Sequence, residues 1–89
     1  MNYVIPVKDK NQACEVLRTL TILGYKQDSK WNLNMLVNGD VDCIYAHEEG
    51  VSAAHSHAGM YTGAHKLVKV EDVESTIKPF QNSDDVGNT

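Results

Sequence analysis

The amphipathic stretch from Lys10 to Leu23 limits the fold of this chain more than any other feature. Its apolar residues recur at the i, i+3, i+4 and i+7 spacing of one α-helical face, namely Ala13, Val16, Leu17, Leu20 and Leu23. Asp9 is a predicted N-cap, and Gln12 follows it three residues later, as in a capping box. Gly24 ends the pattern, because glycine adopts the left-handed conformation after a helix at little cost. The stretch is therefore predicted to form a helix with one face on the core.

Ile22 falls outside the apolar stripe of this predicted helix, on the side of Glu15 and Arg18. We expect it to be exposed, which is ordinary for a single apolar residue. The alternative interpretation is that Ile22 contacts a partner protein.

Two alternating segments on either side of Asn38-Gly39 predict a β-hairpin. Apolar residues occupy every second position from Trp31 to Val37, and residues 41–45 alternate in the same way. Asn-Gly is a strong turn signal, since both residues tolerate positive φ. A three-residue loop with a bulge is predicted, because a two-residue loop would place Met35 opposite Asp42. A further strand is predicted over residues 3–7, where Pro6 belongs at an edge or a strand end.

The segment 48–64 has no clear periodicity and is rich in Gly, Ala and Ser, which predicts a long loop. Residues 65–70 are predicted to form the last strand, with Leu67 among its inward-facing residues. Residues 71–78 favour a short helix, because acidic residues begin it and Pro79 follows it.

The predicted order of elements is β-α-β-β-(long loop)-β-α, which is typical of an α+β fold. One main helix is expected to pack on a small, mostly antiparallel sheet, with the long loop before the last strand. A chain of 89 residues has room for one domain with a modest core. We expect residues 1–80 to form that domain and residues 81–89 to form a disordered polar tail.

Charge, hydropathy and cysteine content argue against several classes of protein, namely nucleic-acid-binding, membrane-spanning and disulfide-rich secreted proteins. The net charge of −4 argues against nucleic-acid binding, which needs a basic surface, and a protein partner suits an acidic domain better. No apolar run approaches membrane-spanning length. Cys14 and Cys43 are too few for a disulfide framework, and no secretory leader is recognisable at Met1. We therefore expect free thiols in a cytoplasmic protein.

Four histidines concentrate the coordinating chemistry of the chain within and beside the predicted loop, at His47, His55, His57 and His65. His55 and His57 would point the same way in an extended segment, and the outer two would meet if their strands pair. Neutral imidazoles bind Zn²⁺, Ni²⁺ or Cu²⁺, so a metal site, with zinc as the candidate ion, is one hypothesis. The alternative is that the imidazoles are solvated, because their spacing matches no established zinc motif.

Enzymatic activity has little support in the sequence. Cys43 lies on the apolar face of a predicted strand, so a core position is favoured over a nucleophile. Ser52 and Ser56 lie near histidines but lack the context of a nucleophile elbow. A nucleotide or small-ligand site near Gly59 and Gly63 stays open as an alternative, although no phosphate-binding motif is present. A pH-sensitive hinge built on the imidazoles is another.

The end of the predicted helix and the segments after it resemble a pattern in small early proteins of tailed bacteriophages. The resemblance is carried by Leu23-Gly24-Tyr25-Lys26, Trp31, the apolar hairpin, and Glu71-Asp72-Val73 after the closing strand. It spans residues 3–77. The resemblance implies a small cytoplasmic phage protein that binds a host component rather than a metabolic enzyme, and it carries over no functional residues.

Together, these observations predict a non-enzymatic protein–protein interaction module that is phage-encoded and binds a host protein, inhibiting or altering it. Its contact surface is predicted in the long loop and at the acidic end of the hairpin, namely at Asp40, Asp42, Glu48, Glu49, His55, His57, Met60 and Tyr61. The alternative function is a metal- or small-ligand-binding protein centred on the four histidines. Self-association through an open sheet edge is a third alternative.

Overall fold

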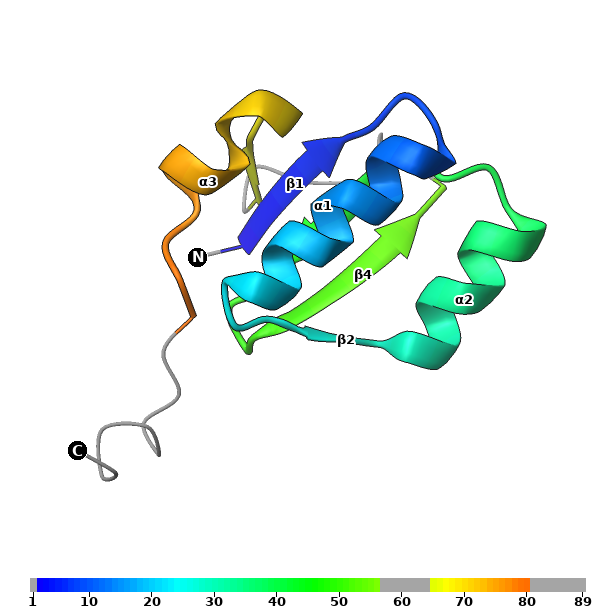
Figure 1. The fold of residues 1–89 in the computed structure, drawn as a ribbon, viewed down its shortest axis with the longest axis horizontal. Helices are drawn as coiled ribbons and strands as arrows, with labels where there is room; N and C mark the ends of the chain where they lie inside the picture. The colour runs from blue at the N-terminus through cyan, green and yellow to red at the C-terminus, as the bar shows by residue number, and fades with distance from the viewer. Residues whose placement is uncertain (1, 57–64, 81–89) are drawn as a thin grey trace.

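A computed structural model of the chain describes residues 2–56 and 65–80, and these form an α+β fold (Figure 1). The elements in chain order are β1 (Asn2–Pro6), α1 (Lys10–Ile22), β2 (Lys26–Gln27), α2 (Ser29–Asn38), β3 (Cys43–Ala46), β4 (Val51–His55), β5 (His65–Leu67), a 3-10 turn (Val70–Asp72) and α3 (Val73–Thr76). None of the helices among these residues is long and apolar enough to cross a membrane.

The five strands form one sheet in the order β2-β4-β3-β1-β5. The central pairs β1–β3 and β3–β4 are antiparallel, whereas the outer pairs β1–β5 and β2–β4 are parallel. The sheet is therefore mixed, and the prediction of a mostly antiparallel sheet was wrong for the two outer strands. Pro6 ends β1, which agrees with the prediction from its missing N–H.

The two faces of the sheet bury different residues. Ile5, Ile44 and Ala54 face α1 and belong to the main core, which the side chains of α1 and α3 complete. Figure 1 shows α1 and α3 on the same side of the strands. Val4 and Cys43 alternate with core residues along their strands, so they face the other way and form a second buried cluster with Tyr45. Burial on both faces explains why every residue of β3 is buried.

Helix α1 confirms the prediction from the apolar stripe, because Ala13, Val16, Leu17 and Leu20 are buried. At its start, the Gln12 backbone N–H donates to Asp9 Oδ1 at 2.8 Å, while Gln12 Oε1 accepts from the Lys8 N–H rather than the Asp9 N–H. At its end, Gly24 has φ +98°. The Tyr25 N–H then donates to the Leu20 carbonyl at 2.9 Å, as in a Schellman motif.

Residues 29–38 form helix α2, so the predicted strand over 31–37 and its Asn38-Gly39 hairpin were wrong. Asp28 caps the helix, because its carboxylate accepts from the Trp31 N–H at 3.3 Å. Leu33 and Val37, expected in the core, are 63% and 64% exposed. Gly39 ends the helix with an extended φ of −119°, so the positive-φ turn expected there is absent. The buried or partly buried residues of α2 follow helical spacing instead of the two-residue alternation, and they are Asn32, Met35 and Leu36.

The side chain of Asn32 joins α2 to the outer edge of β4. Asn32 is only 2% exposed, its Oδ1 accepts from the Ala54 N–H at 2.9 Å, and its Nδ2 donates to the Ser52 carbonyl at 3.3 Å. Trp31 Nε1 donates to the Ala54 carbonyl at 2.7 Å. Strand β2 pairs only with Val51 and Ser52, so these two side chains continue the cover of the β4 edge from the Ser52 carbonyl to Ala54.

Strand β4 lies inside the segment predicted as a long loop, and that prediction was wrong for residues 51–55. The strand pairs antiparallel with β3, and its short side chains Ser52, Ala53 and Ala54 are buried. The observed hairpin turns at residues 47–50, where the His47 N–H donates to the Val51 carbonyl at 2.8 Å and Gly50 has φ +91°. The rest of the predicted loop, from residue 57 to residue 64, lies outside the described residues.

The C-terminal elements follow the prediction more closely. Strand β5 pairs with β1, and α3 buries Val73 just before the buried Ile77. Leu67 is 56% exposed and Val68 is buried, so the inward assignment of Leu67 was wrong. The predicted disordered tail, residues 81–89, lies outside the described residues.

Phe80, at the end of the described residues, packs against Gly24 and Gly50, which are distant in sequence. Its N–H donates to the Leu23 carbonyl at 2.7 Å, and its ring lies 5.7 Å from that of Tyr25. A Cβ at Gly24 would lie 2.7 Å from the Phe80 carbonyl oxygen, and a Cβ at Gly50 would lie 2.7 Å from the Phe80 ring. Phe80 therefore occupies space that side chains at positions 24 and 50 would otherwise fill.

Asn32→Ala tests the bridge between α2 and β4. We expect it to lower the free energy of unfolding by about 1–3 kcal/mol, because it leaves the Ala54 N–H buried without its partner, while the Ser52 carbonyl keeps only the Asp28 N–H at 3.3 Å. Asn34→Ala is the matched control, since Asn34 is exposed on the same helix, and it should change stability by less than about 0.5 kcal/mol. Urea unfolding monitored by circular dichroism measures both. Equal stability of the two variants would contradict the bridge.

Candidate functional site

Three of the four histidines gather around one tyrosine on the sheet face opposite α1. The ring of Tyr45 meets those of His55 and His65 edge-on, at centroid distances of 4.8 and 5.0 Å. The ring of His47 stacks on the same tyrosine at 6.0 Å. All three imidazoles are partly buried. The strands of His47 and His65 do not pair, because β1 lies between β3 and β5, and His57 lies outside the described residues.

Strand register explains this convergence. On β3, Tyr45 and His47 are two residues apart and therefore share a face. His55 on β4 lies opposite Cys43, which is also on that face. His65 on β5 lies opposite Asn2 of β1, and β1 separates β5 from β3 in the sheet. The alternation of side chains along these strands thus places the three imidazoles on the sheet face opposite α1.

The described residues do not complete a metal site. The rings of His47 and His65 lie 6.4 Å apart, and His65 Nδ1 is buried without a hydrogen-bond partner. Among residues 2–56 and 65–80, however, no three His, Cys, Asp or Glu side chains come together in a group that could hold an ion. The contacts of His47, His55 and His65 with Tyr45 are aromatic packing. A zinc site on all four histidines stays a prediction.

The predicted partner-binding residues that the structure describes lie at the two ends of β3 and at the end of β4. Asp40 and Asp42 are exposed just before β3 and line an open hollow of about 700 Å³ with the C-terminal end of α2. Glu48 and Glu49 are exposed in the turn after β3, at the opposite end of that strand, and the Glu48 N–H donates to Asn2 Oδ1 at 2.8 Å. His55 belongs to the tyrosine cluster. Met60 and Tyr61, like His57, lie outside the described residues.

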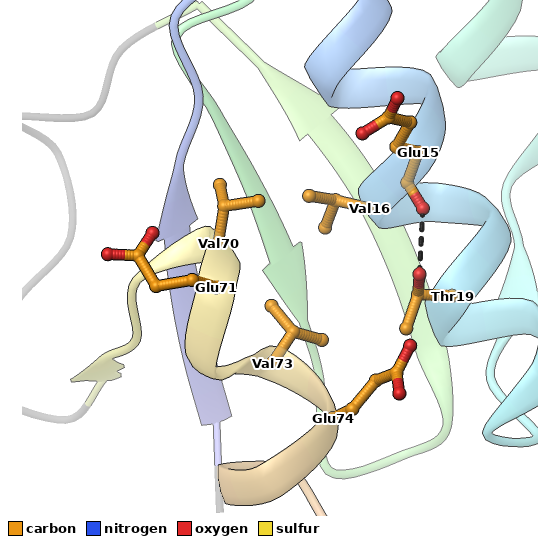
Figure 2. Close-up of a pocket in the computed structure, with 7 residues that line it drawn as sticks. All are labelled: Glu15, Val16, Thr19, Val70, Glu71, Val73 and Glu74. Carbon is orange, nitrogen blue, oxygen red and sulfur yellow. Dashed lines mark hydrogen bonds between the residues drawn. The ribbon is translucent and has the colours of Figure 1, made fainter.

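A second hollow lies between α1 and the α3 end of the chain (Figure 2). Its volume is about 370 Å³, and it is lined by Val16, Val70, Val73, Thr19, Glu15, Glu71 and Glu74. Figure 2 shows the valines between the two elements, with the Glu71 carboxylate directed away from them. The Thr19 hydroxyl is already occupied, because it donates to the Glu15 carbonyl at 3.0 Å. The three exposed carboxylates make this side of α1 acidic.

A groove of a different kind lies between α1 and α2, above β2. Its volume is about 330 Å³, and it is lined by Cys14, Leu17, Arg18, Thr21, Ile22, Gln27 and Leu36. Two of its polar side chains bond to each other, since Gln27 Nε2 donates to Thr21 Oγ1 at 2.8 Å. The Thr21 hydroxyl in turn donates to the Leu17 carbonyl at 2.9 Å. Its walls therefore offer apolar contact and one guanidinium, that of Arg18.

Exposed apolar side chains lie in this groove and on the exposed face of α2. Ile22 is 80% exposed, as predicted from its place outside the stripe. Leu33 and Val37 lie four residues apart on α2 and share an exposed face. Sequence reasoning missed these two because the two-residue period placed them inside. A helical reading of residues 29–38, signalled by the cap Asp28, would have found them.

The two thiols differ in reactivity. Cys14 is exposed in the groove and Cys43 is buried under the tyrosine cluster. Burial raises the pKa of Cys43 above its ordinary value, the Tyr45 hydrogen bond lowers it, and nearby Asp42 raises it. Since the thiolate is the nucleophile, Cys43 reacts slowly at neutral pH.

Iodoacetamide labelling checks this difference. At pH 7.5 we expect one adduct per folded chain, at Cys14, and a second only after unfolding. Raising the pH toward 9 should speed labelling of Cys14 more than that of Cys43, whose raised pKa keeps it protonated. Mass spectrometry counts the adducts, and Cys14→Ser should abolish the fast one. Fast labelling of Cys43 in the folded chain is the result that disagrees with its burial.

Trp31 reports on the histidine face, because its ring lies 5.6 Å from that of His55. It is the single tryptophan of the chain. His55→Gln should change the emission of Trp31, because it replaces the ring that the indole contacts. His47→Gln should leave the emission unchanged, since the ring contacts of His47 are with Tyr45 and His65. Identical spectra of His55→Gln and the wild type would argue against the contact between His55 and Trp31.

The chain matches no family model, no curated protein and no solved structure. The resemblance to early proteins of tailed bacteriophages therefore stays a prediction. The two surfaces described above, the histidine face and the groove between α1 and α2, are the observations from which a function can be argued.

Proposed function

We propose that the protein is a non-enzymatic interaction module that binds another protein through one surface. This α1–α2 surface consists of the groove lined by Cys14, Leu17, Arg18, Thr21, Ile22, Gln27 and Leu36, together with Leu33 and Val37. The observation that supports it most is the 80% exposure of Ile22, which lines the groove, beside α2, where Leu36 lines the same groove and Leu33 and Val37 are 63% and 64% exposed. Aliphatic side chains gathered around a groove mark interaction sites more often than scattered ones do.

The energetics of these residues suit binding. Full burial of one leucine, isoleucine or valine side chain contributes about 1.5–3 kcal/mol. Three of them, each more than half exposed, supply the apolar centre that protein interfaces need. Because the Thr21 and Gln27 polar groups are paired within the groove, a partner buries little unsatisfied polarity there.

The α1–α2 surface replaces the acidic loop as the proposed contact region. Asp42 and Glu48 lie at opposite ends of β3, and neither is in the lining of the α1–α2 groove. If the chain is phage-encoded, as its resemblance implies, the partner is a protein of the host cytoplasm that binding inhibits or alters. The proposal needs no catalytic group.

Leu33→Asp and Val37→Asp test this function. Each removes an exposed aliphatic group and places a charge in the proposed interface, so affinity for a purified partner should fall at least about tenfold. Asn34→Asp and Asn38→Asp are the matched controls, because they add the same charge to another side of the same helix. The partner is captured from bacterial lysate on the wild-type protein, identified and purified, and its Kd is measured by calorimetry.

Thermal unfolding of all four variants is the control that checks whether each variant keeps the fold. The proposal predicts that a bound partner also protects Cys14 from iodoacetamide, since this thiol lines the groove. Equal Kd values for Leu33→Asp and Asn34→Asp, or an unprotected Cys14, overturn the proposed surface. Failure to recover a stoichiometric partner at moderate salt counts against the function itself.

A further inference from the structure

Two edges of the sheet are open among the described strands. Strand β1 is paired on both sides, and the outermost strands are β2 and β5. An open edge presents unpaired N–H and C=O groups, and these pair readily with another strand. Residues 26 to 30, which contain β2 and the start of α2, are all exposed (Figure 1). The edge of β2 is therefore accessible to a second chain.

The hydrogen bonds of β2 determine which of its backbone groups are free. The Lys26 N–H donates to the Gly50 carbonyl at 2.7 Å, and the Asp28 N–H donates to the Ser52 carbonyl at 3.3 Å. Backbone groups alternate in direction along a strand, so the N–H and C=O of Gln27 point away from β4. In an antiparallel ladder, two facing residues of this kind exchange both N–H···O bonds. A second copy of β2 therefore pairs in one register, with Gln27 opposite its own equivalent.

This register is complementary in charge. With Gln27 opposite its equivalent, Lys26 of each copy lies opposite Asp28 of the other. Opposite charges at facing positions of neighbouring antiparallel strands attract each other. Both side chains are exposed, and the Asp28 carboxylate, which accepts from the Trp31 N–H through Oδ1, has a second oxygen for an ammonium group.

Strand β5 lacks this complementarity. Within residues 65–69, antiparallel pairing with a second copy is centred on Lys66 or on Leu67. The first register places two lysines opposite each other, and like charges at facing positions repel. The second register places Lys66 opposite Val68, with His65 opposite Lys69. The charges therefore favour β2 over β5 as the edge that pairs.

We infer that β2 pairs antiparallel with β2 of a second copy of this chain, forming a two-fold symmetric dimer with one continuous sheet. Two backbone hydrogen bonds at Gln27 and two contacts between Lys26 and Asp28 hold the copies together. An interface centred on so few residues lies at the low end of the size range, so the dimer forms at high protein concentration. The inference goes beyond the proposed function and does not depend on it.

The groove between α1 and α2 adds apolar contact to this pairing. Gln27 lines the groove together with Ile22, which is 80% exposed. The two-fold axis at the Gln27 pair runs perpendicular to the sheet, so both copies of α1 lie on the same face. The two grooves then adjoin across the axis, and Ile22 of each copy becomes partly buried, which favours the dimer.

Sedimentation velocity of the purified chain tests the inference. Between about 10 µM and about 1 mM, the sedimentation coefficient of the wild type should rise toward that of a dimer. Lys26→Asp places carboxylates opposite each other at both contacts, so it should weaken self-association at least about tenfold. Lys69→Asp is the matched control, because it makes the same charge change at an exposed position outside β2, and it should leave self-association unchanged.

A mixture of two variants tests the register. Asp28→Lys places lysines opposite each other, so it should also associate weakly by itself. An equimolar mixture of Lys26→Asp and Asp28→Lys restores opposite charges at both contacts and should associate where neither variant does alone. Thermal unfolding checks that each variant folds, since Asp28 also caps α2. Asp28→Asn, which keeps a capping side chain, restores one of the two contacts in the same mixture if Asp28→Lys does not fold.

Three results would overturn the inference. They are a wild-type chain that stays monomeric up to about 1 mM, a Lys26→Asp variant that associates as the wild type does, and a mixture that associates no better than its components. All of these measurements use the purified chain alone. They can therefore fail while the effect of Leu33→Asp on a natural partner upholds the proposed function.

Discussion

The buried amide of Asn32 is the interaction on which the arrangement of this molecule depends most. It meets both a donor and an acceptor of the β4 backbone, so it acts like one more residue of a neighbouring strand. Only a helix that begins near residue 29 brings Asn32 to that edge, with Trp31 Nε1 bonded to the next carbonyl. Because a buried unpaired amide is costly, this contact fixes the rotation of α2 about its axis. The rotation in turn leaves Leu33 and Val37 in solvent.

The sheet therefore separates two kinds of surface. Its helical side carries a core and, at the margin between α1 and α2, an apolar groove whose lining includes Arg18. Its other side carries Tyr45 with three imidazoles around it. The proposed function uses the first surface, because its exposed aliphatic groups gain by burial. The histidine face is held together mainly by ring contacts between residues of neighbouring strands.

An element could be predicted from the sequence when the contacts that determine it join residues close together in the chain. Helix α1 was predicted correctly because its cap, stripe and terminal glycine lie within sixteen consecutive positions, from Asp9 to Gly24. Helix α2 was missed because its apolar residues also fit a two-residue period, and the contact that decides between them joins Asn32 to residues twenty and more positions away. Strand β4 was missed because Ser52 and its alanine neighbours look like a loop, although small side chains also allow close packing. The convergence of the histidines was partly foreseen, and the groove was not, because it exists only once α2 is a helix.

Phe80 packs against two glycines that lie twenty-six positions apart, so the effects of substitutions at these glycines are linked. Gly24 and Gly50 both have positive φ, and both give up side-chain volume to the same aromatic residue. A bulkier residue at either position displaces Phe80 and so disturbs the packing at the other. Substitutions at Gly24, Gly50 and Phe80 should therefore have non-additive effects on stability, because both glycines lie against the same residue.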